Sequence, residues 1–226
     1  MNLDLTDSWH ETFPRAHIGV LLVGGVDNSV RDTPLEARKR EIEADLRTQF
    51  AGRIRADLLE LDVLGAYHAY YRRFDQTYHV QLQLESVVFK GKPLPNVTPL
   101  VDANFMAELQ TFVLTAGHDA DLLRGGLRVD VTRGGEAFTQ LGGKVRTLKA
   151  GDMSMADETG IVCTVLYGQD ARTPISAQTR RALYVAYAPA GVPVNAVHHQ
   201  LEIILMHVRL FAPDAVVEHL EVRGER

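Results

Sequence analysis

The sequence predicts an α+β fold, a single domain in which a β-sandwich or barrel-like sheet is flanked by helices. Amphipathic helical patterns fill the first half of the chain, and short apolar runs separated by glycine pairs fill residues 127–187. One more amphipathic helix is expected after Pro193. Because helices and strands are segregated, a doubly wound parallel sheet is not expected. A chain of 226 residues, 46% of them hydrophobic, can bury one substantial core over residues 1–226.

The first predicted element is a buried strand over residues 17–24, an apolar run that ends in a glycine pair. A helix over residues 34–50 follows. Thr33 is its expected cap, Pro34 takes the first helical position, and Glu36 completes a capping box. Apolar residues then recur at four-residue spacing and give the helix one buried stripe. The stripe consists of Ile42, Leu46 and Phe50.

Two further helices are predicted in this half of the chain. The helix over residues 62–75 has an aromatic-rich face, which at helical spacing indicates core packing. That face consists of Val63, Tyr67, Tyr70, Tyr71 and Phe74. The helix over residues 98–112 starts with Thr98 as cap and Pro99 at the first helical position. Its expected buried stripe is Val101, Phe105, Leu109 and Phe112. Residues 78–89, between the two helices, fit a strand and a helix equally well.

The C-terminal half predicts strands joined by turns, then a helix. Residues 127–131 alternate between apolar and polar, and apolar runs follow at residues 161–166 and 183–187. The last predicted element is a helix over residues 195–211. Its apolar face consists of Val197, Leu201, Ile204, Leu205, Val208 and Phe211.

Charge restricts the kind of partner. With a formal net charge of −5, binding of nucleic acid requires a local basic patch. The densest basic clusters are residues 38–40, 72–73 and 180–181, and each is more typical of a solvated face than of a phosphate track. The single cysteine, Cys163, excludes an intrachain disulfide and an all-cysteine metal site, and we expect it to be buried.

No apolar run approaches the roughly 20 residues of a membrane span, and residues 1–10 lack the pattern of a signal peptide. We therefore expect a cytoplasmic protein with no membrane partner. The sequence contains no Walker phosphate loop, no GxGxxG and no Gly-x-Ser-x-Gly elbow. No cofactor and no metal are expected. His118 and Asp119 imitate a metal-binding pair, but the favoured interpretation is a turn in which Asp119 or Asp121 caps the following segment.

A series of short strings identifies a family resemblance. LPNVTPLVDAN at residues 94–104 is similar to a family string N-P-V-V-D-x-x-N, and AGHDAD at residues 116–121 is similar to H-A-F-D-x-D. Matching turns follow, in the same order, at Gly135-Glu136, Leu141-Gly142-Gly143, Ala156-Asp157 and residues 160–179. Together they resemble the tRNA-binding and editing module of the phenylalanyl-tRNA synthetase β subunit, its fused third and fourth B domains, in a free-standing form. The resemblance covers about residues 65–190 and implies that residues 78–89 are helical.

The resemblance implies a free-standing module that binds tRNA or another RNA and has no synthetase activity. Two alternatives stay open. One is a trans-editing hydrolase that deacylates mischarged aminoacyl-tRNA, and the other is a protein that binds an amino acid or a small metabolite. The oligomeric state is not predicted.

The resemblance also implies a pocket between residues 104–119 and residues 160–173. Asn104 matches the pocket asparagine of the family, whereas the neighbouring threonine is replaced by Ala103. The editing histidine falls near Thr115 or Ala116, and the editing glutamate falls near Pro174.

The candidate catalytic residues are His118 and Asp119, and the candidate ligand-binding residues are Asn104, Arg172 and Thr173. The Asn104 amide would orient a polar group of the ligand, and Arg172 would bind a carboxylate or phosphate through its two-pronged guanidinium. His118 would position or activate a water if Asp119 or Asp121 fixed its tautomer. The alternative is that His118 and Asp119 only close a turn.

Overall fold

The computed structural model of the chain describes residues 2–30 and 33–224. Its helices are α1 (Asp7–Thr12), α2 (Thr33–Gln49), α3 (Arg55–Leu58), α4 (Asp62–Arg72), α5 (His79–Val88), α6 (Pro99–Thr111) and α7 (Val194–Arg209), with a 3₁₀ turn η1 at Ala120–Leu122. Its strands are β1 (Leu3–Leu5), β2 (His17–Gly24), β3 (Thr115–Asp119), β4 (Leu127–Val131), β5 (Ala137–Thr139), β6 (Val145–Thr147), β7 (Met153–Asp157), β8 (Gly160–Thr164), β9 (Gly168–Gln169), β10 (Ala182–Ala188) and β11 (Val216–Arg223).

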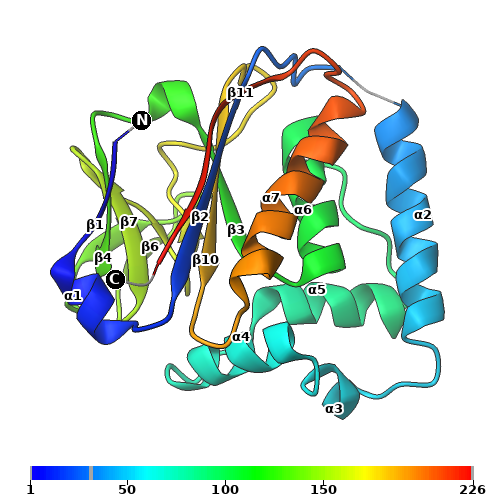
Figure 1. The fold of residues 1–226 in the computed structure, drawn as a ribbon, viewed down its shortest axis with the longest axis horizontal. Coiled ribbons are helices and arrows are strands. Elements are labelled where there is room, and N and C mark those ends of the chain that lie inside the picture. Colours follow the sequence, from blue (N-terminus) through cyan, green and yellow to red (C-terminus); the bar gives the residue numbers. More distant parts are fainter. Residues whose placement is uncertain (1, 31–32, 225–226) are drawn as a thin grey trace.

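The strands form two main sheets and a separate hairpin. One sheet has the order β1-β4-β7-β8-β9, the other has the order β11-β2-β10-β3, and β5 pairs with β6. Figure 1 shows the two sheets as adjacent layers, with α6 and α7 covering the outer face of the second sheet and α2 outermost. The predicted α+β class is confirmed. The described strands close into no barrel, so the layered arrangement is the one present.

The predicted strand at residues 17–24 is confirmed as β2, which lies between β10 and β11 and is antiparallel to both. Its apolar side chains are buried because the other sheet packs on one face and α7 on the other. Gly19 lets α7 approach closely, since a Cβ there would lie 2.5 Å from Cγ1 of Val197. Near-continuous apolarity, rather than alternation, is therefore the expected pattern for this strand.

The four predicted helices are confirmed as α2, α4, α6 and α7, and residues 79–88 form helix α5, as the resemblance implied. The expected capping threonine of α2 has its side chain outside the described residues. The expected cap of α6 is wrong in one respect. Thr98 occupies the capping position, but its hydroxyl makes no capping hydrogen bond. Asp102 instead holds the segment that leads into α6, because its Oδ1 accepts a hydrogen bond from the Val97 amide at 2.9 Å.

Two predicted details at the strand level need correction. The chain does not end in a helix, because β11 follows α7 and adds an edge strand beside β2. This strand shows no regular apolar–polar alternation, because Val216 and Leu220 are exposed while Glu221 is half-buried. His118 and Asp119 do not form a simple turn, because both lie in strand β3. The N-terminal elements β1 and α1 were not predicted, since β1 has only three residues.

The aromatic face of α4 packs in the core, as predicted, and it also anchors the helix to the sheets. The hydroxyl of Tyr67 donates to the Tyr187 carbonyl at 2.8 Å, and that of Tyr71 donates to the Val165 carbonyl at 2.7 Å. The hydroxyl of Tyr70 donates to Asp152 at 2.6 Å. These hydroxyls are committed inside the protein and do not face a nucleic acid. None of the helices described is both long enough and apolar enough to span a bilayer.

Candidate functional site

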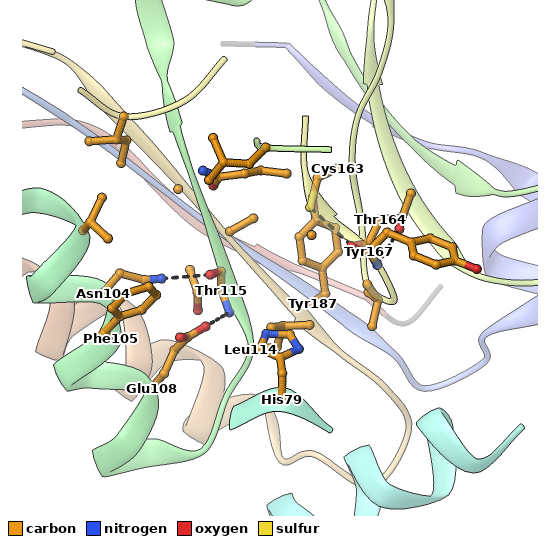
Figure 2. A pocket seen from close by; sticks show the side chains of 18 of the residues that line it. His79, Asn104, Phe105, Glu108, Leu114, Thr115, Cys163, Thr164, Tyr167 and Tyr187 are labelled. Atoms are coloured by element: carbon orange, nitrogen blue, oxygen red, sulfur yellow. Dashed lines mark hydrogen bonds between the residues drawn. The ribbon is translucent and has the colours of Figure 1, made fainter. Parts of the chain in front are cut away.

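A cavity of about 370 Å³ lies where α6 and β3 meet β8, β9 and the tip of the β5–β6 hairpin. It therefore lies between the two segments, 104–119 and 160–173, that were expected to enclose a pocket. Figure 2 shows α6 supplying one wall and the segment that follows β8 supplying the opposite one. The lining residues are His79, Val97, Val101, Asn104, Phe105, Glu108, Leu114, Thr115, Ala116, Gly117, Gln140, Leu141, Cys163, Thr164, Val165, Tyr167, Gly168, Gln169, Ile175 and Tyr187.

The wall formed by α6 results from the way the chain leaves this helix. Phe112 takes the left-handed conformation (φ 62°) after the last turn and directs the chain back along the helix into β3. Asn104 and Glu108, one turn apart on α6, then hold the returning strand by the backbone of Thr115. The Asn104 amide donates to the Thr115 carbonyl at 2.9 Å, and the Glu108 carboxyl accepts from the Thr115 amide at 2.8 Å.

This geometry corrects the predicted apolar stripe of α6. Leu109 is buried as expected, but Val101 and Phe105 are only half-buried because they line the cavity. Phe112 is also half-buried, at the helix end. Part of the apolar face of α6 therefore lines the cavity instead of packing in the core.

Glu108 is the acidic residue of the cavity wall. It is 2% exposed, and burial raises its pKa to about 8, although the hydrogen bond from the Thr115 amide acts in the opposite direction. At neutral pH the Glu108 side chain is therefore mostly protonated. The neighbouring Asn104, 6% exposed, uses its NH₂ group on Thr115, and its Oδ1 accepts no hydrogen bond from the described residues.

His79, at the end of the cavity nearest α5, is held in one tautomer. Its Nδ1 lies 3.2 Å from the Tyr71 hydroxyl, which itself donates to the Val165 carbonyl, so Nδ1–H donates and Nε2 is left as an acceptor. The ring borders the cavity, and the surrounding protein lowers its pKa to about 4 by desolvation. Cys163 is buried as expected, and burial raises the pKa of its thiol. Both side chains are uncharged at neutral pH.

Of the five candidate site residues, Asn104 is the one that lines the cavity. His118 and Thr173 lie together in a separate buried network. The Thr173 hydroxyl donates to Asp170 at 2.6 Å, so it accepts from Nδ1–H of His118 at 2.8 Å. Burial, and then the charge of Arg172, lower the His118 pKa to about 4. Its Nε2 contacts no partner among the described residues.

Asp119 has a capping role, as one of the two interpretations of its segment expected. Its Oδ1 accepts from the Asp121 amide at 3.1 Å at the start of η1, and its Oδ2 accepts from the Thr179 hydroxyl at 2.6 Å. Both oxygens are thus engaged within the protein. The tautomer of His118 is set by Thr173, not by Asp119 or Asp121. A catalytic role for His118 and Asp119 remains a prediction.

Arg172 makes the two-pronged contact that was predicted, but with a carboxylate of its own chain. Its Nη1 and Nη2 each donate to one oxygen of Asp157 at 2.9 Å, and its Nε lies 3.5 Å from Asp170. Burial acts to raise the pKa of Asp157, but hydrogen bonds, first from Thr159 and then from Arg172, lower it to about 2. Arg172 is therefore occupied in holding the segment beside the cavity.

We expect Arg172→Lys to lower the free energy of unfolding by roughly 1 kcal/mol, because lysine cannot reproduce both bonds to Asp157 and the pair is partly exposed. Ligand affinity should be unchanged, since Arg172 does not line the cavity. Urea denaturation and a binding titration on the same variant measure the two effects. A loss of affinity with full stability would instead place Arg172 in the binding site.

The basic clusters were expected to lie on solvated faces, and the structure differs for Lys39. Lys39 is buried against Asp102. The guanidinium of Arg73 lies 5.3–5.7 Å from three aromatic ring centres. Arg180 pairs with an aspartate, and Arg181 forms ion pairs with both Asp121 and Glu218. Lys39 and Arg181 are therefore engaged within the protein, whereas Arg40, Arg72, Arg73 and Arg180 are exposed.

Among the cavity residues that sequence reasoning missed are Glu108 and His79. Glu108 stands four residues after Asn104 on a mostly apolar helix, and this i, i+4 polar pair was the available signal. His79 gave no signal, because its segment was ambiguous in periodicity.

Comparison with known proteins gives the following matches. The model of a family described as the B3/4 domain matches residues 66–205. Among solved structures, an N-terminal fragment of the phenylalanyl-tRNA synthetase β subunit from Pyrococcus horikoshii is similar, with 9% identity and a TM-score of 0.49. The alignment covers 100% of this chain and 51% of that fragment, so the chain spans about half the fragment's length. No curated protein sequence matches the chain.

Proposed function

The chain belongs to the B3/4 domain family, the module found in phenylalanyl-tRNA synthetase β subunits, and from this premise we propose that it is an aminoacyl-binding module without synthetase activity. The cavity receives an amino-acid-like group, which is presented either free or esterified to tRNA. The sequence resemblance favours tRNA binding as the function. In this proposal the protein contacts only the aminoacylated end of the tRNA.

The observation that carries the proposal is the chemistry of the cavity wall. A volume of about 370 Å³ with mainly apolar and aromatic walls suits a small ligand. No lysine or arginine is among the described lining residues, whereas one carboxyl group and several amides are. A phosphate or carboxylate would find no counter-charge in this lining, so in this proposal the amine and side chain enter the cavity and the carboxyl end stays at its mouth. An amine with an apolar side chain would find both an acceptor and a matching surface.

Deacylation is a second candidate, and His79 is the observation that favours it. Its free Nε2 borders the cavity and can accept a hydrogen bond from a water. Attack of that water on an aminoacyl ester would form a new C–O bond, break the ester C–O bond and pass the proton to the departing ribose hydroxyl. The position of the family's editing histidine does not supply such a group here. Thr115 or Ala116 corresponds to it, and the Thr115 hydroxyl accepts from Gln200 at 2.9 Å.

A binding panel with three arms tests the proposal: free L-amino acids, the corresponding aminoacyl-tRNAs, and unacylated tRNA. We expect binding in at least one of the first two arms and weaker or no binding of unacylated tRNA. Calorimetry serves for the free amino acids and filter binding for the tRNAs, with release of the amino acid followed in the same samples. Equal affinity for acylated and unacylated tRNA, with no binding of amino acids, would contradict an aminoacyl pocket and favour general RNA binding.

A further inference from the structure

We propose that Glu108 binds the protonated amine of the ligand and releases its own proton as the ligand enters. This inference rests on the proposed function and assigns the ligand specificity of the cavity to Glu108. Glu108 would distinguish ligands that carry an amine from ligands of the same shape that lack one.

The geometry supplies hydrogen-bond acceptors where an amine needs them. Glu108 and Asn104 lie one helical turn apart on the cavity wall, and each uses one side-chain atom on the backbone of Thr115. Their remaining atoms are a second carboxyl oxygen on Glu108 and the amide oxygen of Asn104, and neither meets a donor among the described residues. The Asn104 amide is fixed in orientation, because its NH₂ group must face the Thr115 carbonyl. An ammonium group has three N–H donors and can satisfy both acceptors.

Glu108 is the residue of the site that can become charged near neutral pH, because the other titratable groups around it stay neutral. They are Tyr67 and Tyr71 from α4, Tyr78 and His79 from α5, Cys163 from β8 and Tyr187 from β10. Burial raises the pKa of each tyrosine and of the thiol, and lowers that of His79. All of them are neutral around pH 7. Without a neighbouring cation in the lining, a ligand ammonium would be the counter-ion of Glu108.

A proton is therefore expected to leave when the amine binds. Burial raises the pKa of Glu108 to about 8, so the side chain carries its proton at neutral pH. An ammonium within hydrogen-bond distance favours the carboxylate and lowers that pKa. Affinity for a permanently protonated amine should then rise by up to roughly tenfold per pH unit below pH 8 and level off above it.

Calorimetry with L-amino alcohols as probes tests the inference. These compounds keep the ammonium group and the side chain but carry no carboxylate. The panel covers aromatic and aliphatic side chains, and each member is paired with the alcohol that lacks the amine. Titrations at pH 6, 7 and 8, in two buffers that differ in ionisation enthalpy, give both the affinity and the number of protons released.

The variant is Glu108→Gln, which keeps an acceptor for the Thr115 amide but cannot become charged. We expect it to weaken binding of the best amino alcohol by about tenfold or more at pH 8 and to abolish the proton release. Glu43→Gln is the matched control, because Glu43 is also buried and accepts from a backbone amide, that of Leu94, but lies away from the cavity. It should leave affinity and proton release unchanged.

The outcomes separate this inference from the proposed function. If amino alcohols bind, but equally well to wild type and Glu108→Gln, or no better than the amine-free alcohols, the assignment of Glu108 is wrong and the aminoacyl pocket stands. If neither free amino acids, amino alcohols nor aminoacyl-tRNA bind the wild-type protein, the proposed function fails and the assignment fails with it. Thermal unfolding of both variants verifies that each is folded.

Discussion

Replacing Asp102 with alanine is expected to lower the free energy of unfolding by about 3–5 kcal/mol, the cost of leaving one partner of a buried ion pair behind. Asp102 on α6 lies 2.8 Å from Nζ of Lys39 on α2, and the two side chains are 5% and 3% exposed. Asp102 also accepts from the Val97 amide. The substitution therefore removes the main counter-charge of a buried lysine and a bond to the loop that enters α6.

Denaturation with urea measures this loss, and Glu41→Ala is its control. Glu41 pairs with Arg38 on the same helix, α2, but those side chains are 62% and 33% exposed, so we expect a loss of less than about 1 kcal/mol. A double-mutant cycle with Lys39→Met and Asp102→Asn isolates the energy of the pair itself. A loss below 1 kcal/mol for Asp102→Ala would mean that the other partners of Lys39, which are Glu36, Asn96 and the Pro95 carbonyl, compensate fully.

The same ion pair connects stability to the site. Val97 and Val101, on either side of the helix start, line the cavity. Weakening the contact between α2 and α6 should therefore loosen one wall. Asp102→Ala should lower ligand affinity together with stability, whereas Glu41→Ala should change neither.

Local patterns predicted most of the fold because they reflect local physics. The proline at the first position of α6, the four-residue apolar spacing of α2 and the unbroken apolarity of β2 each specify an element without reference to its neighbours. The elements that were missed lack such a pattern. Strand β1 has three residues, and β11 is an edge strand without regular alternation, in which apolar Val216 and Leu220 are exposed and Glu221 is half-buried.

The site was harder to predict than the fold, because its residues acquire their roles only through tertiary contacts. Asn104 was identified through a family string, and it does line the cavity. Arg172 was expected to hold a ligand, but its guanidinium binds Asp157, fifteen residues away in the chain, and spacing alone gives no sign of that pairing. Glu108 depends on the left-handed turn at Phe112, which places the Thr115 amide beside its carboxyl group. Periodicity on α6 cannot show where the following strand will lie.

The second large effect concerns the cost of burying Glu108. Its pKa is 4.5 in an unstructured chain and about 8 in the folded protein. Between these values the folded protein keeps a proton that the unfolded chain has released, so stability is lost as pH rises from 4.5 through 8. Glu108→Gln does not titrate and escapes this loss.

We therefore expect Glu108→Gln to be more stable than wild type by roughly 3–5 kcal/mol at pH 9, and the two proteins to differ little at pH 4.5, since a pKa difference of one unit corresponds to about 1.4 kcal/mol. Urea denaturation across this pH range measures the difference. Glu43→Gln should instead lose stability, because Glu43 forms an ion pair with Arg47. A difference between Glu108→Gln and wild type that did not grow with pH would show that Glu108 is already ionised in the folded protein. If the stability difference grows with pH and Glu108→Gln also binds the amine more weakly, the buried carboxyl group of Glu108 destabilises the folded protein but is needed to bind the ligand.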